Sequence, residues 1–191
     1  MIGTDRITLV RVRLKQWLTY RSLWKSLLNS PDSGLLFGSQ RQRTPSWVDY
    51  AREAAFSAPH QWKCHRFLIL LADQAIGVAD IHEDRINAVC FLVLGLLPQY
   101  RGRKLGAIAA RLMLRKSFVD FNARRVESTA IASNIASLRM QDGMIQEGVL
   151  KERSLIGTQL YDEFIFRMLK SEWEEQNRER ALRRTHSTAV S

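Results

Sequence analysis

The sequence predicts an α/β fold, with one domain built on a central sheet and helices on its faces. Three observations point to this class. Residues 88–97 form a continuous apolar run, which is typical of a strand buried on both faces. A glycine-containing turn and an amphipathic helix follow directly, and strand and helix patterns succeed one another along the chain. With 191 residues, 46% of them hydrophobic and 25% charged, the chain has the composition of a single globular domain.

Two helices and two strands are expected before the apolar run. The first helix is predicted at Leu14–Leu28. Its apolar side chains recur at helical spacing and are more typical of a core than of a base-stacking surface: Trp17, Leu18, Trp24, Leu27 and Leu28. The second helix begins after Thr44, a typical N-cap, with Pro45 at its first position. Strands are expected at residues 66–72 and 75–81, joined by a tight turn.

The most informative segment is residues 97–107, which we call the glycine turn. It joins the apolar strand to a helix whose apolar residues share one face, from Leu105 to Met113. Backbone N–H groups at the start of a helix lack intrahelical partners and lie at the positive end of the helix dipole. Gly102 has no side chain to keep an anion away from them. The segment therefore predicts a binding site for a diphosphate.

Gln99, Gly102 and Gly106 in the glycine turn resemble the acyl-CoA signature of the GNAT superfamily of N-acetyltransferases. That signature is Gln or Arg, two residues, Gly, one residue, then Gly or Ala. Lys104 departs from it, because the family usually has Gly or Ala at this position. A lysine is expected to take a helix-start position without backbone strain. Its ammonium group either adds to phosphate binding or crowds the pyrophosphate.

A second resemblance lies in the C-terminal half of the chain. The Asn-x-x-Ser-x-Arg pattern at residues 134–139 and the segment at 143–148 are similar to the Asn-x-x-Ser-x-Arg, Gly-Phe-x-x-Glu-Gly region of one GNAT branch. This branch contains the ribosomal-protein N-terminal (alanine/serine) acetyltransferases. Matches to its opening strand at residues 4–9 and its closing strand at 163–169 extend the resemblance over most of the chain, as far as Trp173.

The resemblance implies the GNAT fold, a mixed central sheet that is largely antiparallel, splayed between its fourth and fifth strands, and flanked by helices. We expect a single GNAT acyltransferase domain at residues 1–175 and a flexible basic tail at 176–191. The resemblance also implies acetyl-CoA as the co-substrate and no metal. Amides of the strand residues before the turn are expected to face the pantetheine and thioester, with Gly95 marking a bulge or a close backbone approach.

The expected CoA-binding residues lie on this strand, in the glycine turn and at the start of a later helix. They are Val93, Leu94, Gly95, Leu96, Gln99, Arg101, Gly102, Arg103, Lys104, Leu105, Gly106, Ala107 and Asn134. Asn134 resembles the asparagine with which the family contacts pantetheine, and it is also a natural helix N-cap. Both roles are compatible.

Candidates for proton transfer are fewer. Ser137 matches the serine that some members of the branch place near the CoA sulfur, so it is expected to protonate the departing thiolate. An ordinary helix serine that bonds back to the preceding turn is the alternative. His82 and Glu83, at the end of the third strand, are candidates for the general base, directly or through water, although a surface hairpin turn also explains them. Bulk water is the remaining candidate for removing the amine proton.

These features predict an N-acyltransferase that moves an acyl group from acetyl-CoA directly to a primary amine, without a covalent enzyme intermediate. The acceptor is expected to be a protein N-terminus or a small amine. Two alternatives stay open. One is a GNAT-fold acyltransferase that takes an aminoacyl-tRNA donor or acts on a nucleic-acid-borne amine, and the other is a non-catalytic nucleic-acid-binding module. The sequence is compatible with a monomer or a homodimer.

The charge of the chain indicates polyanionic partners. The formal net charge is +10 and the isoelectric point is about 10.2, so the surface attracts CoA, RNA, DNA or an acidic protein face. A basic loop contains Arg41 and Arg43, which are expected to contact the substrate. The C-terminal tail adds four arginines, namely Arg178, Arg180, Arg183 and Arg184. A solvated helix end explains the tail as well.

The cysteines and the hydropathy indicate the compartment. Cys64 and Cys90 are far apart in the sequence and lack histidines at ligand spacing, so we predict buried thiols, with neither a disulfide nor a zinc site. The longest apolar run is too short to span a bilayer, and residues 1–13 lack an apolar signal core. A cytoplasmic location is therefore expected, with no membrane partner.

Overall fold

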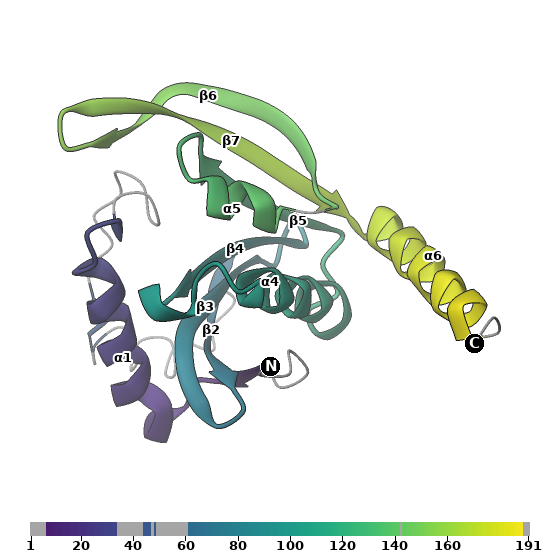
Figure 1. Ribbon diagram of the computed structural model, residues 1–191, viewed down its shortest axis with the longest axis horizontal. Coiled ribbons are helices and arrows are strands. Elements are labelled where there is room, and N and C mark those ends of the chain that lie inside the picture. The colour runs from purple at the N-terminus through teal and green to yellow at the C-terminus, as the bar shows by residue number, and fades with distance from the viewer. Residues whose placement is uncertain (1–6, 34–43, 47, 49–60, 142, 189–191) are drawn as a thin grey trace.

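The computed structural model describes residues 7–33, 44–46, 48, 61–141 and 143–188. A twisted sheet runs through the molecule, with α1 on one side, α4 and α5 on the other, and α6 projecting from one end (Figure 1). The strands are β1 Ile7–Arg11, β2 Trp62–Leu71, β3 Gln74–Asp84, β4 Val89–Leu96, β5 Arg125–Ile131, β6 Ile145–Ile156 and β7 Gln159–Leu169. The helices are α1 Leu14–Leu28, α4 Leu105–Arg115, α5 Ile135–Met140 and α6 Lys170–Thr188.

The described strands form one seven-stranded sheet in the order β1-β2-β3-β4-β5-β7-β6. Only the β4–β5 pairing is parallel among the described strands, and the other neighbours are antiparallel. The β4–β5 ladder has three pairs, from Val89↔Arg125 to Phe91↔Glu127, and then ends. These findings confirm the predicted α/β fold, with a mixed sheet that is splayed between its fourth and fifth strands.

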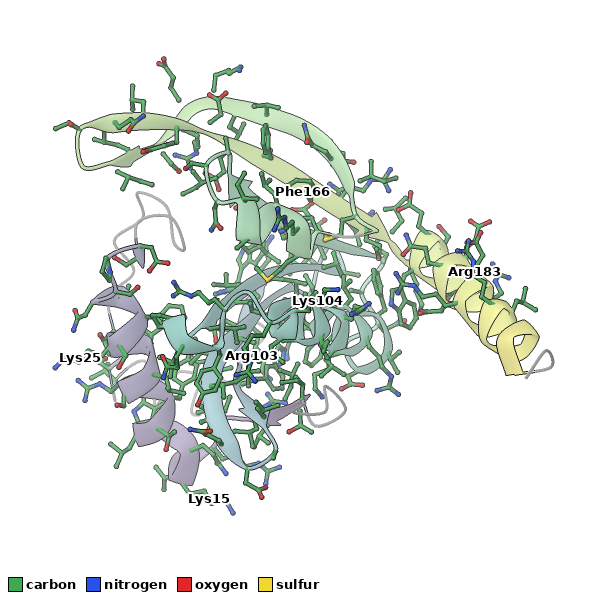
Figure 2. The ribbon with its side chains drawn as sticks, in the orientation of Figure 1. Lys15, Lys25, Arg103, Lys104, Phe166 and Arg183 are labelled. Carbon is green, nitrogen blue, oxygen red and sulfur yellow. The ribbon has the colours of Figure 1, made fainter. Side chains whose placement is uncertain are left out.

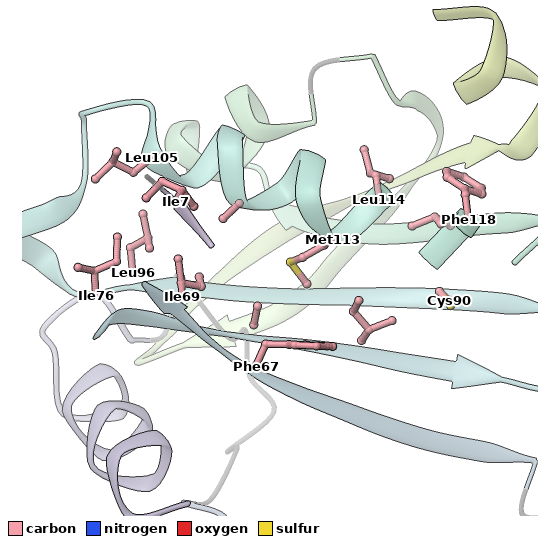
Figure 3. Packing of buried hydrophobic residues seen from close by; sticks show 14 of the residues in the cluster. Ile7, Phe67, Ile69, Ile76, Cys90, Leu96, Leu105, Met113, Leu114 and Phe118 are labelled. Atoms are coloured by element: carbon pink, nitrogen blue, oxygen red, sulfur yellow. The ribbon is translucent and has the colours of Figure 1, made fainter. Parts of the chain in front are cut away.

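The main core lies between the sheet and α4. The face of α4 that bears Leu105, Ala109 and Met113 packs on side chains from β2, β3 and β4 (Figure 3). A π-helical turn at Lys116–Asp120 extends α4 and adds Phe118 to this core, where its ring lies 5.2 Å from that of Trp173. Apolar spacing on the helix and alternation on the strands thus produce one continuous apolar layer.

The opposite face of the sheet is covered by α1. Trp17, Tyr20, Trp24 and Leu27 are buried there against β2 and β3. The rings of Trp17 and Tyr20 stack at 5.8 Å, and those of Tyr20 and Trp24 at 6.1 Å. The helix has the predicted bounds, and its tryptophans belong to the core as expected.

Two strands are longer than the sequence predicted. β2 begins at Trp62 and β3 continues to Asp84. His82 and Glu83 therefore lie inside β3 on opposite faces, and the idea that they form a hairpin turn is wrong. The turn follows Asp84, whose carboxylate accepts hydrogen bonds from the backbone N–H groups of Ile86 and Asn87 at 3.1 Å each. Such a local side-chain cap defines a turn better than hydropathy does.

Several predictions lie outside the described residues. They include Arg41 and Arg43, residues 4–6 of the opening strand, and nearly all of the helix expected after Pro45. At the other end, α6 continues through residue 176, where the basic tail was expected to begin, as far as Thr188. Among the described residues, no helix is both long and apolar enough to cross a membrane.

Gly77 lets β3 approach β4 closely at Gly95. A Cβ atom placed on Gly77 would collide with the backbone carbonyl oxygen of Gly95 and lie 2.9 Å from a methyl group of Leu96. The β3–β4 register runs without a shift through the pair Val78↔Gly95. The close approach therefore requires a glycine at position 77, on β3, and the β3–β4 ladder has no bulge at Gly95.

We expect Gly77→Ala to lower the free energy of unfolding by about 1–3 kcal/mol, because the new methyl group would collide with the β4 backbone and force it to shift. Gly148→Ala is the matched control, since a Cβ at this strand glycine meets nothing within 4 Å. Urea unfolding of both variants measures the difference. Equal stabilities would contradict the close packing of β3 on β4.

Candidate active site

The end of β4 has one free edge. Its first residues pair with β5 as far as Phe91, and the described part of β5 offers no pairing partner to the residues that follow. The N–H of Leu97 donates to the carbonyl of Ile76 at 3.0 Å, so this position faces β3. Because backbone groups alternate along a strand, the N–H of Leu94 points away from β3, toward the splay. Among the predicted strand positions, alternation therefore directs the N–H groups of Leu94 and Leu96 toward the splay and those of Val93 and Gly95 toward β3.

The glycine turn has two residues in the left-handed region. Gly102 has φ +73°, and Lys104, the N-cap of α4, has φ +60°. The expectation that Lys104 sits without backbone strain is thus wrong, since a Cβ in this region is unfavourable by about 1–2 kcal/mol. The first intrahelical bond runs from Ile108 N–H to the carbonyl of Lys104. The amides of Leu105, Gly106 and Ala107 precede it and have no acceptor within the helix.

The surface of the glycine turn is exposed and cationic. Gln99, Gly102, Arg103 and Lys104 are all exposed, and the two basic side chains lie at the start of α4 (Figure 2). A Cβ on Gly102 would meet nothing within 4 Å, so open space lies over its Cα. Unpaired amides, a helix N-terminus and two cations around open space can bind a phosphate or diphosphate.

Three predicted CoA-binding residues have packing roles: Arg101 and Leu105 through their side chains, and Gly106 through the absence of one. Arg101 donates from Nε to the carbonyl of Leu96 at 2.8 Å and forms an ion pair with Asp32, which follows α1. Leu105 is buried in the core. A Cβ on Gly106 would lie 2.5 Å from Sδ of Met140, so this glycine admits α5 beside α4. The side chains of Arg101 and Leu105 therefore stabilise the fold, and only the backbone groups of these two residues are left to contact a ligand.

The Arg101–Asp32 ion pair was not foreseen from the sequence. It ties the glycine turn to the segment after α1, across a separation of 69 residues. Neither residue belongs to a local motif, and only the tertiary structure brings them together. A salt bridge between one half-buried and one partly exposed side chain restricts the position of the turn relative to α1.

Asn134 and Ser137 lie at the start of α5. The Asn134 side chain accepts a hydrogen bond from the backbone N–H of Ser137 at 3.0 Å, which confirms its N-cap role. Ser137 is half-buried, and its hydroxyl makes no hydrogen bond with any described residue. The alternative role, a bond back to the preceding turn, is therefore not observed among the described residues, and the hydroxyl is available to a ligand.

His82 and Glu83 have different surroundings. Glu83 lies on the α4 side, where its carboxylate accepts a hydrogen bond from Nε2 of His65 at 2.7 Å. Arg11 donates to Nδ1 of the same ring at 3.0 Å, and the ring stacks on Phe121 at 4.0 Å. Burial lowers the pKa of His65 below its usual value. Glu83 is thus committed to a structural histidine that sequence reasoning did not single out.

His82 faces the α1 side instead. It pairs in the sheet with Cys64 on β2 and Phe91 on β4. Burial, followed by the nearby charge of Arg66, lowers the pKa of His82 below its usual value. The structure therefore separates the two residues proposed as general base and places them on opposite faces.

The match to a known family covers most of the chain. Residues 7–142 match the acetyltransferase (GNAT) domain. The chain belongs to the GNAT acetyltransferase family. It is thus an N-acetyltransferase by family. The candidate site described above consists of the splayed β4–β5 pair and the glycine turn that follows β4.

Two curated relatives come from Bacillus subtilis. The SPbeta prophage-derived uncharacterized N-acetyltransferase YokL is 24% identical over 174 residues, which covers 89% of this chain and 93% of that protein. The uncharacterized N-acetyltransferase YnaD is 31% identical over 78 residues, which covers 40% of this chain and 46% of that protein. Both names agree with the GNAT assignment.

Solved structures show the same fold. The spermidine N-acetyltransferase of Vibrio cholerae, in complex with CoA and spermine, superposes with a TM-score of 0.72 at 16% identity, over 88% of this chain and 98% of that one. A probable acetyltransferase superposes with a TM-score of 0.70 at 18% identity, over 91% and 97% of the two chains. At these identities the likeness concerns the fold.

Lys104→Gly is expected to be more stable than Lys104→Ala by about 1 kcal/mol, because both remove the lysine side chain but only glycine relieves the left-handed Cβ. Chemical denaturation of the two variants measures this difference. Equal free energies of unfolding would contradict the left-handed conformation at this helix start.

Proposed function

We propose that this GNAT enzyme transfers an acetyl group from acetyl-CoA directly to a primary amine. One observation carries the proposal. The free edge of β4 ends directly in an exposed glycine turn with unpaired amides, so a thioester beside Leu94 and a pyrophosphate at Gly102 can belong to one extended molecule. Acetyl-CoA has both groups. The family assignment supports this donor.

The backbone provides most of the chemistry in this proposal. The N–H of Leu94 donates to the thioester carbonyl and stabilises the oxyanion that forms when the amine attacks. The amides of residues 105–107 and the cations Arg103 and Lys104 bind the pyrophosphate. The Asn134 amide group contacts the pantetheine while its oxygen caps α5. Positioning and oxyanion stabilisation then account for the rate enhancement.

Two proton transfers complete the reaction. Ser137, whose hydroxyl has no described partner, donates a proton to the CoA thiolate as it leaves. Glu83 is engaged by His65, which argues against it as the base that deprotonates the amine. His82 faces the α1 side of the sheet, opposite the side on which α5 carries Ser137, so we assign the amine proton to solvent. Nitrogen attacks the carbonyl carbon, the carbon–sulfur bond breaks, and an amide and free CoA are the products.

The branch motif does not by itself identify the acceptor, because its residues have structural roles here. A Cβ on Gly143 would lie 2.6 Å from Oε1 of Gln176, so this glycine allows α6 to pack. Glu147 forms ion pairs with Arg125 and Arg167 across the β5–β7–β6 part of the sheet. Membership in the branch of ribosomal-protein N-terminal acetyltransferases accordingly remains part of our proposal.

Net charge narrows the range of acceptors. The related Vibrio cholerae enzyme was solved with spermine, a polycation. A chain with a net charge of +10 repels such an acceptor at long range and slows its association. We therefore propose a protein N-terminus or a small amine with neutral or acidic flanking groups. A screen of such peptides and amines against spermine tests this preference.

Gly102→Val should raise the dissociation constant for acetyl-CoA at least tenfold, because its side chain enters the open space above the turn. Isothermal titration calorimetry at low and moderate salt measures the binding. Gly157→Val is the matched control, since Gly157 has φ +63° and nothing within 4 Å but lies in the β6–β7 turn. Similar affinities for both variants would rule out the glycine turn as the pyrophosphate site.

Ser137→Ala should lower kcat about tenfold or more with little change in acetyl-CoA affinity, because it removes a proton donor used only when the thiolate leaves. Steady-state kinetics with an accepted amine measures the effect. Ser133→Ala changes an exposed serine in the preceding turn and serves as the control. A wild-type kcat for Ser137→Ala would remove this residue from the mechanism.

A further inference from the structure

A cluster of metal-binding side chain types lies on the α1 side of the sheet, on the face opposite α4. It consists of Cys64 from β2 and of Asp80 and His82 from β3. Cys64 pairs directly with His82 in the ladder, and Asp80 is two residues before His82 on the same face. The thiol sulfur, one carboxylate oxygen and one imidazole nitrogen all lie within 4.8 Å of one another.

The carboxylate of this cluster is held from behind by α1. Asp80 is 5% exposed, and the hydroxyl of the fully buried Tyr20 lies 2.7 Å from each of its oxygens. The tyrosine hydroxyl donates a hydrogen bond to the carboxylate and fixes its orientation. A hydrogen bond from an outer residue to a ligating carboxylate is a regular feature of protein metal sites. Tyr20 thus orients Asp80 as such an outer partner does.

We propose that Cys64, Asp80 and His82 bind a zinc ion with one coordination position left open. Sulfur, imidazole nitrogen and carboxylate oxygen together suit Zn²⁺, which prefers four ligands in a tetrahedron with bonds of about 2.0–2.3 Å. Such a tetrahedron separates its ligand atoms by about 3.5 Å. Cys64 and His82 are only half-buried, so small side-chain rotations bring the three atoms onto one ion.

Charge balance is consistent with a dication. A Cys64 thiolate and the Asp80 carboxylate contribute two negative charges to the site. Arg66 lies on the same face of β2, where its guanidinium carbon is 5.9 Å from the ring centres of both Trp17 and Tyr20. Its positive charge weakens zinc binding relative to a site without a cation. We therefore expect a moderate affinity, below that of a closed structural zinc site.

The proposed ion lies next to the point where the sheet opens. His82 pairs with Phe91, the last residue of β4 that pairs with β5. The ion would lie on the side of the sheet covered by α1, whereas Ser137 belongs to α5, which contacts α4 on the other side. Zinc binding at this cluster is independent of the acyl transfer proposed above.

Co²⁺ is the probe for this site, because it binds in place of Zn²⁺ and its absorption spectrum depends on the number and type of its ligands. The metal-free full chain is titrated with Co²⁺. We expect one equivalent to bind, with the strong visible bands of tetrahedral Co²⁺ and a near-ultraviolet thiolate-to-cobalt charge-transfer band. Zn²⁺ should then abolish these bands by displacement and should raise the Tm of the chain.

Cys64→Ser and Cys90→Ser are a matched pair of variants. Cys90 is buried in the core on the α4 side, away from the cluster, so Cys90→Ser should keep the charge-transfer band. Cys64→Ser should lose this band and the Tm increase with Zn²⁺, while its far-ultraviolet circular dichroism stays that of the folded protein. Absence of the band in the unsubstituted chain, or its persistence in Cys64→Ser, would overturn the proposal.

Discussion

The short ladder between β4 and β5 is the constraint on which the candidate site depends. Three pairs join the strands at one end, and the pairing stops at Phe91. A longer ladder would consume the backbone groups of the residues that follow, because paired N–H and C=O groups are unavailable to a ligand. The N–H of Leu94 can meet a bound molecule only because the ladder is short. The backbone groups available to a ligand are thus determined by the pairing of β4 with β5.

A strand with one free edge needs its position fixed from the other side. The antiparallel β3–β4 ladder continues through the splayed part as far as Leu96, and the contact between Gly77 and Gly95 brings the two backbones close. Arg101 then holds the carboxyl end of β4 by its bond to the Leu96 carbonyl and extends to Asp32 after α1. β4 is therefore anchored on one edge and at its end, and the opposite edge remains open.

The sequence predicts the elements and the position of the site better than it predicts the contacts. Hydropathy periods place α1 at its observed bounds, and the glycine turn follows β4 as predicted. Pairs such as His65 with Glu83, or Arg101 with Asp32, arise between residues distant in the sequence and leave no local pattern. The same reason hides the cluster around Asp80, since spacing rules for cysteine and histidine detect ligands from one segment only.

Lys104 combines a strained backbone conformation with an added positive charge at the candidate site. The GNAT signature usually has Gly or Ala here, and the left-handed φ of +60° explains why glycine suits the position. A lysine keeps the same backbone conformation at an energetic cost, as residues at functional sites often do. In return it places an exposed cation beside Arg103 at the start of α4. The proposed co-substrate, acetyl-CoA, is a polyanion. An additional positive charge at its pyrophosphate offsets the strain of the left-handed backbone at Lys104, so the departure from the family pattern is compatible with CoA binding.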